Sequence, residues 1–187
     1  MNDNLKTIIL QDLYRCTGKK DRKTYNNFYR REPTFRFTVL LRKYQFYKNH
    51  NKIFAFILKI RLRLLRLLFG IWIPNEIKLG KGFYIGHIGT IVINAEVTIG
   101  DNVNVNQGVT IGKINRGRKK GCPMIGNEVW IGTNAVVVGK IRIGNNVLIA
   151  PNAFVNIDVP DNSIVIGNPA IIKYCKSATE EYICNKV

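Results

Sequence analysis

The sequence predicts a mainly β protein, a parallel solenoid of short strands that follows an α-helical N-terminal part. Two observations carry this prediction: a six-residue repeat runs from residue 79 onward, and the charge balance changes at residue 70. Residues 1–70 hold 17 Lys and Arg against 4 Asp and Glu, whereas residues 71–187 hold 12 against 8. We therefore expect a basic helical region over residues 1–70 and a β-solenoid domain over residues 71–187.

The repeat pairs an aliphatic residue with a small or turn-forming residue at intervals of six. The pairs begin at Leu79, Ile85, Ile99, Val105, Ile111, Ile125, Ile131, Val137, Ile143, Ile149 and Val155. Short strands rich in Val and Ile point alternate side chains inward, and Gly or Asn after them tolerates the positive φ of a sharp turn. Because one hexapeptide cannot bury its own aliphatic side chain, the stack of turns is the unit of stability. These hexapeptides resemble those of left-handed parallel β-helices, which implies about five triangular coils over residues 79–166.

Two breaks interrupt the repeat, and the second makes room for a loop over residues 112–124. This loop carries four Lys and Arg residues between positions 116 and 120. Binding residues are commonly placed on surface loops of a rigid scaffold, although a solvated insertion produces the same pattern. A C-terminal tail follows the last repeat.

The segment 54–73 is long and apolar, but Lys59 and three arginines interrupt it. Each of these charges costs about 2.5–3.5 kcal/mol at a bilayer centre, so we expect an amphipathic helix with a basic face and no membrane span. Three interpretations of this helix stay open. It packs its apolar side on the rest of the protein, it docks on an anionic membrane, or it guides an acidic polymer toward a nearby site.

Several classes of protein and partner are disfavoured. The four cysteines are scattered and no secretory signal opens the sequence, which favours a cytoplasmic protein, either free or at the inner face of the membrane. With only two histidines and no Cys pair at ligand spacing, no metal site is predicted. No nucleic-acid-binding module or nucleotide-binding loop is visible, so we predict no nucleic-acid partner.

His87 is the one candidate for proton-transfer chemistry in the solenoid, and it lies at the first break of the repeat, in GFYIGHIGT. A neutral imidazole can act alone as a general base at cytoplasmic pH. From the residues alone, a structural role for this histidine is the more ordinary interpretation.

The whole chain resembles the serine O-acetyltransferase group of hexapeptide acyltransferases, including relatives in bacterial surface-polysaccharide clusters. The matching motifs are GKGFYIGHIGTIVIN, VNVNQGVTIG with the loop after it, VPDNSIVIGNPA, and Arg31-Glu32-Pro33 in the helical part. The resemblance implies transfer of an acetyl group from acetyl-CoA to a hydroxyl, in a homotrimer or a dimer of trimers with active sites between neighbouring solenoids. It also implies that His87 is the catalytic base that removes the hydroxyl proton.

The same resemblance implies a set of residues that bind acetyl-CoA along the solenoid edge. These are Thr133, Pro151, Asn156, Ile157, Gly167, Pro169, Ala170 and Lys173. The family places a Lys or Arg directly after Pro-Ala, whereas this chain has Ile171 there and its cation two positions later. Ordinary turn formation also accounts for Gly, Asn and Pro at such positions.

The acceptor site is expected at Glu32, Gly86, Arg116, Arg118 and Cys122. Glu32 keeps an acidic family position, but Gly86 replaces the acid before the histidine and Gly121-Cys122 replaces an Arg-His pair. The family's aspartate that orients the histidine aligns with Trp72, which leaves Glu32 and Glu76 as candidates by charge. A site that loses such partners loses affinity for a small polar substrate.

We therefore expect free serine to be a poor acceptor and the substrate to be a sugar hydroxyl of a surface or capsular polysaccharide or its precursor. Peripheral membrane contact through the basic helix belongs to this hypothesis. Two alternatives stay open: serine O-acetylation in cysteine biosynthesis, and a non-catalytic solenoid that binds a membrane or a polyanion.

Overall fold

The computed structural model describes residues 3–187, so the first two residues of the predicted N-terminal region lie outside it. Four helices precede the strands: α1 (Asp3–Thr17), α2 (Arg22–Arg31), α3 (Pro33–Tyr47) and α4 (Lys52–Phe69). Asp21 and Asn51 cap α2 and α4 with their side-chain oxygens, and Gly70, in the left-handed conformation, ends α4. None of the described helices combines the length and apolarity needed to cross a membrane.

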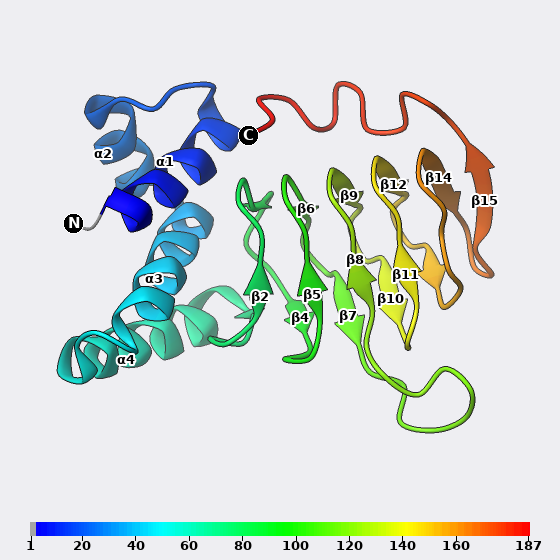
Figure 1. Cartoon of the computed structure of the whole chain (residues 1–187), viewed down its shortest axis with the longest axis horizontal. Coiled ribbons are helices and arrows are strands. Elements are labelled where there is room, and N and C mark those ends of the chain that lie inside the picture. Colours follow the sequence, from blue (N-terminus) through cyan, green and yellow to red (C-terminus); the bar gives the residue numbers. More distant parts are fainter. Residues whose placement is uncertain (1–2) are drawn as a thin grey trace.

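The strands that follow wrap around one axis as three sheets, which we call faces A, B and C (Figure 1). Face A consists of β1 (Ile71–Trp72), β4 (Ile91–Ile93), β7 (Thr110–Gly112), β10 (Val136–Val138) and β13 (Phe154–Val155). Face B consists of β2 (Lys78–Leu79), β5 (Thr98–Ile99), β8 (Met124–Ile125) and β11 (Arg142–Ile143). Face C consists of β3 (Tyr84–Ile85), β6 (Asn104–Val105), β9 (Val129–Ile131), β12 (Val147–Ile149), β14 (Ser163–Ile166) and β15 (Ile171–Tyr174).

Strand pairing confirms the predicted parallel solenoid. Neighbours within the first four coils lie three strands apart in the chain and are parallel, so each coil contributes one strand to each face. β15 instead returns antiparallel to β14 and closes the last coil. The aliphatic residues of the repeat stack in register, as in the column Ile93, Ile111, Val137 and Val155, whose side chains are all buried. Each such side chain contributes about 1.5–3 kcal/mol when fully buried.

The glycines that follow the face B strands are required for a different reason from the one predicted. Gly80, Gly100, Gly126 and Gly144 do not have positive φ. A Cβ on Gly126, for instance, would lie 2.5 Å from the carbonyl oxygen of Gly144 in the next coil, so close stacking of backbones excludes any side chain there. The left-handed conformation occurs two residues later, at Gly82, Asn102, Glu128 and Asn146.

The helical region shares its core with the first coils. Leu41 of α3 and Leu62 of α4 belong to the same buried cluster as Ile71 and Ile91 of face A. Arg42 also joins the two regions, because it pairs with the buried Asp12 of α1 (Nε to Oδ2 2.9 Å) and donates to the carbonyl oxygens that end β2. The change at residue 70 therefore separates two kinds of secondary structure that share one continuous core.

Candidate active site

The corner between faces C and A gathers most of the predicted site residues. His87 follows β3, Thr133 follows β9, Pro151 follows β12, and residues 167–170 follow β14. Because successive coils stack about 4.8 Å apart, these residues form one column about 19 Å long. His87 stands at its N-terminal end, and the turn at 167–170 stands at the other. The structure thus brings the candidate base and the larger part of the predicted acetyl-CoA residues onto one edge.

The imidazole of His87 lies at the surface, in a bend of the chain, and is not buried inside a coil. The backbone N–H of Gly86 donates to the carbonyl oxygen of Val105, which holds the start of this bend to the next coil (3.0 Å). Among residues 3–187, no side chain makes a hydrogen bond with the His87 ring. The ring is therefore open to a bound substrate, as a general base requires.

Glycine is required at position 86 because the neighbouring coil leaves no room for a side chain. A Cβ at this position would clash with Oδ1 of Asn106, whose side-chain amide donates to the carbonyl oxygen of Ile131 (2.8 Å). The asparagine of the next coil therefore occupies the space that an acid before His87 would need.

The two carboxylates considered as partners of His87 lie in different places. Glu76, at the corner between faces A and B, accepts a hydrogen bond from the hydroxyl of Tyr44 (3.1 Å) and pairs with Lys48, so it is engaged elsewhere. Glu32 is exposed at the start of α3 and acts electrostatically on Tyr84 of β3. Burial raises the pKa of Tyr84, and the carboxylate of Glu32 adds to this rise. Of the two carboxylates, Glu32 is thus the one that acts on the strand leading into His87.

The corner between faces A and B holds the rest of the predicted residues. Asn156 and Ile157 follow β13 there, and the carbonyl oxygen of Asn156 accepts a hydrogen bond from Lys119 of the loop. The predicted edge is therefore split, since face A separates these two residues from the His87 column. Lys173 lies on neither corner, because it is an exposed residue of β15.

The loop over residues 112–124 is an ordered hairpin that projects from this second corner (Figure 1). Ile114 and Gly121 exchange two backbone hydrogen bonds at its base (3.0 and 2.9 Å), and Arg116 and Arg118 are exposed near its tip. Cys122 donates to Oδ1 of Asn94 (3.3 Å). Burial raises the pKa of this thiol, which makes Cys122 a polar contact and a poor nucleophile.

A cavity of about 420 Å³ opens at the base of the loop. It is lined by Glu96, Gly121, Cys122, Met124, Lys140, Ile141, Arg142 and Asp158. Two carboxylates and two cations around one small cavity suit a zwitterionic ligand. Sequence reasoning identified Cys122 here but missed the four charged residues. The repeat could have revealed them. Lys140 and Asp158 follow strands of face A, as the loop itself does, so the hexapeptide register places them at the same corner as the loop.

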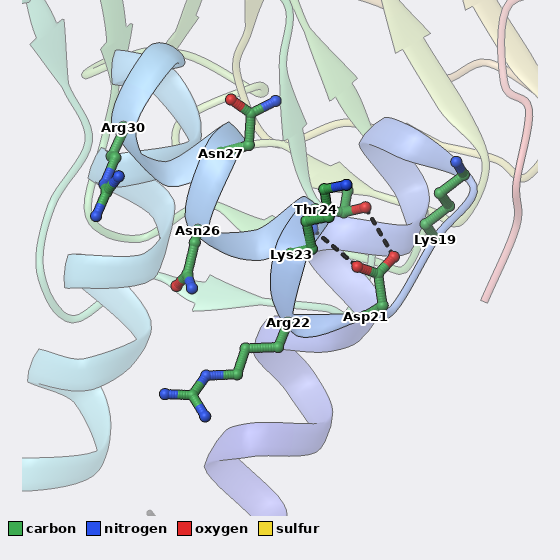
Figure 2. A pocket seen from close by; sticks show the side chains of 8 residues that line it. All are labelled: Lys19, Asp21, Arg22, Lys23, Thr24, Asn26, Asn27 and Arg30. Carbon is green, nitrogen blue, oxygen red and sulfur yellow. Dashed lines mark hydrogen bonds between the residues drawn. The ribbon is translucent and has the colours of Figure 1, made fainter.

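A larger hollow of about 1050 Å³ lies at the outer end of the helical region (Figure 2). Its lining is basic, with Lys19, Arg22, Lys23 and Arg30, but Asp21 uses its carboxylate to cap α2 through Thr24 (2.8 and 2.7 Å). No predicted site residue lines it. Within residues 3–187, no group of three His, Cys, Asp or Glu side chains could hold a metal ion.

The outer side of face A is apolar for a solvent-facing surface. Its outward side chains include Trp72, which is 48% exposed, Val92, Val136, Val138 and Phe154. This face separates the His87 column from the loop and its cavity. The two halves of the candidate site consequently do not meet within one chain.

Comparison with known proteins identifies relatives of this architecture. A family model described as bacterial transferase hexapeptide (six repeats) matches residues 123–156. A serine acetyltransferase of Helicobacter pylori is 37% identical over 121 residues, which cover 65% of this chain and 71% of that protein. A serine acetyltransferase of Staphylococcus aureus is 43% identical over 107 residues, 57% of this chain and 50% of that protein.

Solved structures agree with these relatives. The Neisseria gonorrhoeae serine acetyltransferase in complex with serine has a TM-score of 0.74 and 28% identity, and the match covers 92% of this chain and 70% of that one. The Brucella abortus enzyme in complex with coenzyme A has a TM-score of 0.70 and 26% identity, over 91% and 66% of the two chains. The predicted left-handed β-helix with a helical N-terminal part is thereby confirmed.

The predicted acceptor is corrected by the same relatives. These relatives are named serine acetyltransferases, not polysaccharide O-acetyltransferases. The expectation of a saccharide acceptor was therefore wrong. It gave too much weight to the missing acid and Arg-His pair, although other charged residues line the cavity beside Cys122.

Proposed function

The chain belongs to the hexapeptide-repeat acyltransferase family, and we propose that it transfers the acetyl group of acetyl-CoA to the hydroxyl of serine. One observation carries this proposal. The exposed His87 stands at the head of the corner column, in a chain that is 37% identical to a serine acetyltransferase over 121 residues.

His87 acts as the general base. Its unprotonated ring nitrogen takes the proton of the serine hydroxyl as that oxygen bonds to the acetyl carbon, and the carbon–sulfur bond then breaks. The imidazolium returns the proton to the departing thiolate, so the histidine is neutral again when CoA-SH leaves. General-base assistance of this kind is worth about 10²–10⁴-fold in rate. Holding both substrates beside one another provides a further large factor.

Acetyl-CoA lies along the column between faces C and A. Thr133 is half-buried and Pro151 and Gly167 are exposed there, so the edge offers turn backbone to an extended pantetheine arm. The column length of about 19 Å separates the reacting thioester at His87 from the far end of the cofactor. Lys173 lies on face C beside the far end of this column, three residues after the turn at 167–170, and we assign it to the phosphate groups of the cofactor.

Serine binds at the cavity beside Cys122. Lys140 and Arg142 provide cations for its carboxylate in place of the family's Arg-His pair, and Glu96 and Asp158 provide anions for its ammonium group. Arg116 and Arg118 stand on the loop above and raise the local concentration of anionic substrates.

Three copies of the chain complete the site. Because face A separates His87 from the loop, the loop and cavity of one copy must serve the His87 column of a neighbour. The apolar outer side of face A offers the contact surface for such a homotrimer.

The test is release of CoA thiol from acetyl-CoA with and without serine. The wild-type protein is expected to release thiol only with serine, and His87→Ala is expected to lower kcat by about 10²–10⁴-fold. His50→Ala is the matched control, since its ring stacks on Phe46 at the far end of α3. Equal kcat values in the two variants, or the lack of any serine-dependent release, would contradict the proposal.

A second variant tests the acceptor site. Lys140→Ala is expected to raise KM for serine about tenfold and to leave KM for acetyl-CoA unchanged, because one charge-assisted hydrogen bond contributes about 1.5–3 kcal/mol. Lys186→Ala, at an exposed ion pair with Glu128 on another corner, is the control and should change neither constant. An unchanged KM for serine in Lys140→Ala would exclude this cavity as the carboxylate site.

A further inference from the structure

Gln107 occupies the coil of the His87 column between the candidate base and the first predicted acetyl-CoA residue. It follows β6, just as His87 follows β3 and Thr133 follows β9. Successive coils stack about 4.8 Å apart. If the thioester reacts at His87 and the pantetheine arm runs along the column, the acetyl end of the cofactor must lie beside Gln107.

The side chain of Gln107 packs against the bend that carries His87. A Cβ on Gly89, in this bend, would lie 3.0 Å from the Cβ of Gln107. At this corner the first coil has two more residues than the second, counted between the pairings of β3 with β6 and of β4 with β7. The backbone of Gln107 is fixed in turn, because its carbonyl oxygen accepts from the N–H of Asn134 (3.0 Å). Gln107 therefore lies directly next to the bulge that presents the base.

The side-chain amide of Gln107 has no partner within residues 3–187. Its Oε1 atom is buried and accepts no hydrogen bond, and its Nε2 atom donates none and is not buried. A buried carbonyl oxygen without a donor costs stability. The reverse orientation would bury an NH₂ group and leave two donors unpaired instead of one acceptor. The amide consequently favours the orientation that turns its N–H donors outward beside His87.

The other polar side chains around β6 are used by the fold. Asn106 donates its amide to the carbonyl oxygen of Ile131 (2.8 Å), and Asn104 accepts from Arg15 (2.7 Å). Gln107 makes no such bond, and a methionine would fill the same space without burying an unpaired oxygen. Packing therefore does not explain a glutamine at this position, and an unpaired polar group of this kind calls for a functional explanation.

We propose that Gln107 is a catalytic residue whose Nε2–H donates a hydrogen bond to the carbonyl oxygen of the acetyl thioester. This inference rests on the proposed acetyl transfer at His87. As the acceptor hydroxyl oxygen bonds to the acetyl carbon, one electron pair of the C=O bond moves onto its oxygen, and the amide stabilises that negative charge. When the carbon–sulfur bond breaks, the pair re-forms the carbonyl. Gln107 neither gains nor loses a proton.

The competing role for Gln107 is to orient His87, with Oε1 accepting a hydrogen bond from the ring. Two observations favour the donor role. The His87 ring is exposed whereas Oε1 is buried, and no hydrogen bond joins the two residues in the described part of the chain. The nitrogen end of the amide is also the end that reaches the column surface, where the thioester lies.

The first test replaces the amide by an apolar group of similar size. Gln107→Met is expected to lower kcat for serine-dependent thiol release by about 10²–10³-fold and to change KM for acetyl-CoA by less than about threefold. Gln11→Met is the matched control, because Gln11 is a half-buried glutamine of α1 in the helical region. It should keep the wild-type kcat. A wild-type kcat in Gln107→Met would overturn the proposal.

Two further measurements on Gln107→Met exclude other roles of the amide. Its urea midpoint should equal or exceed that of the wild-type protein, since the variant removes a buried unpaired oxygen. A midpoint well below the wild-type value would make the amide part of the packing and overturn the proposal. The pH at which kcat/KM is half-maximal reports the pKa of the base and should stay unchanged. A displaced pH midpoint would assign Gln107 to the orientation of His87 and also overturn it.

Infrared difference spectroscopy of bound acetyl-CoA, labelled with carbon-13 at the acetyl carbonyl, tests the hydrogen bond without any acceptor. The carbonyl band should lie at lower frequency in the wild-type protein and in Gln11→Met than in Gln107→Met, because a donated hydrogen bond weakens the C=O bond. Equal frequencies in all three proteins would overturn this proposal even if serine is acetylated. The expected difference in a protein that releases no thiol with serine would support Gln107 and contradict only the serine acceptor.

Discussion

In the solenoid every coil buries its aliphatic side chains on those of the next coil, whereas the helical region adds a few unique polar contacts to the core that it shares with the first coils. The column through Ile93, Ile111, Val137 and Val155 repeats one interaction, and neighbouring columns duplicate it. The helical region relies on the buried pair of Arg42 and Asp12 and on the contact of Arg15 with Asn104 (2.7 Å). The stability of the solenoid is therefore distributed over many equivalent residues, whereas the attachment of the helical region depends on a few individual residues.

The largest expected loss of stability is at Asp12. Its carboxylate is fully buried, and burial raises its pKa against the opposing effects of Arg42 and of the Phe83 N–H. Asp12→Ala leaves the Arg42 guanidinium buried without its partner, which should lower the free energy of unfolding by about 3–5 kcal/mol. Urea unfolding measures this loss.

The exposed pair of Lys48 and Glu76 is the matched control for that experiment. Lys48→Ala should cost less than about 1 kcal/mol, because surface ion pairs contribute little. Comparable losses in both variants would remove the contrast between the two regions.

A single truncation in the solenoid is expected to cost somewhat less. Ile131 is fully buried between Val105 and Ile149 of the adjoining coils. Ile131→Ala should lower the free energy of unfolding by about 2–5 kcal/mol, near the lower end if the stack relaxes around the cavity, and Ile131→Val by about 0.5–1.5 kcal/mol. If Ile131→Ala lowered the free energy of unfolding by much more than Asp12→Ala, measured by the same method, stability would not be distributed over the repeats.

The smallest effect tests why glycine follows the face B strands. Gly126→Ala should cost about 1–3 kcal/mol, because the new Cβ meets the carbonyl oxygen of Gly144. Gly117→Asn is the comparison, since Gly117 has φ 76°, a Cβ there would meet no other atom within 4 Å, and asparagine tolerates that conformation. It should be nearly neutral. A neutral Gly126→Ala would refute the close-stacking explanation.

The sequence was sufficient for the fold because the same hexapeptide signal occurs many times. Errors at single positions, such as the reason for Gly126, do not change the predicted architecture. His87 was singled out by its residue type and by the break in the repeat, and its role as the base was implied by the family resemblance and stays a prediction. The acceptor was predicted wrongly because the missing family residues, among them the acid at Gly86 and the Arg-His pair at Gly121-Cys122, were interpreted as a lost serine site. Lys140 and Arg142 lie well beyond the loop in the sequence and come beside Cys122 only when the coils stack.

By itself the sequence determined the solenoid, its basic loop, the helical region before it and the position of the candidate base. These features depend on the spacing of residues along the chain, which can be read directly from the sequence. Only the tertiary structure decided which corners share an edge, that face A divides the site, and which side of α4 is left exposed. Those properties depend on which coil or helix covers each surface, and a pattern within one segment holds no information about its neighbours in space.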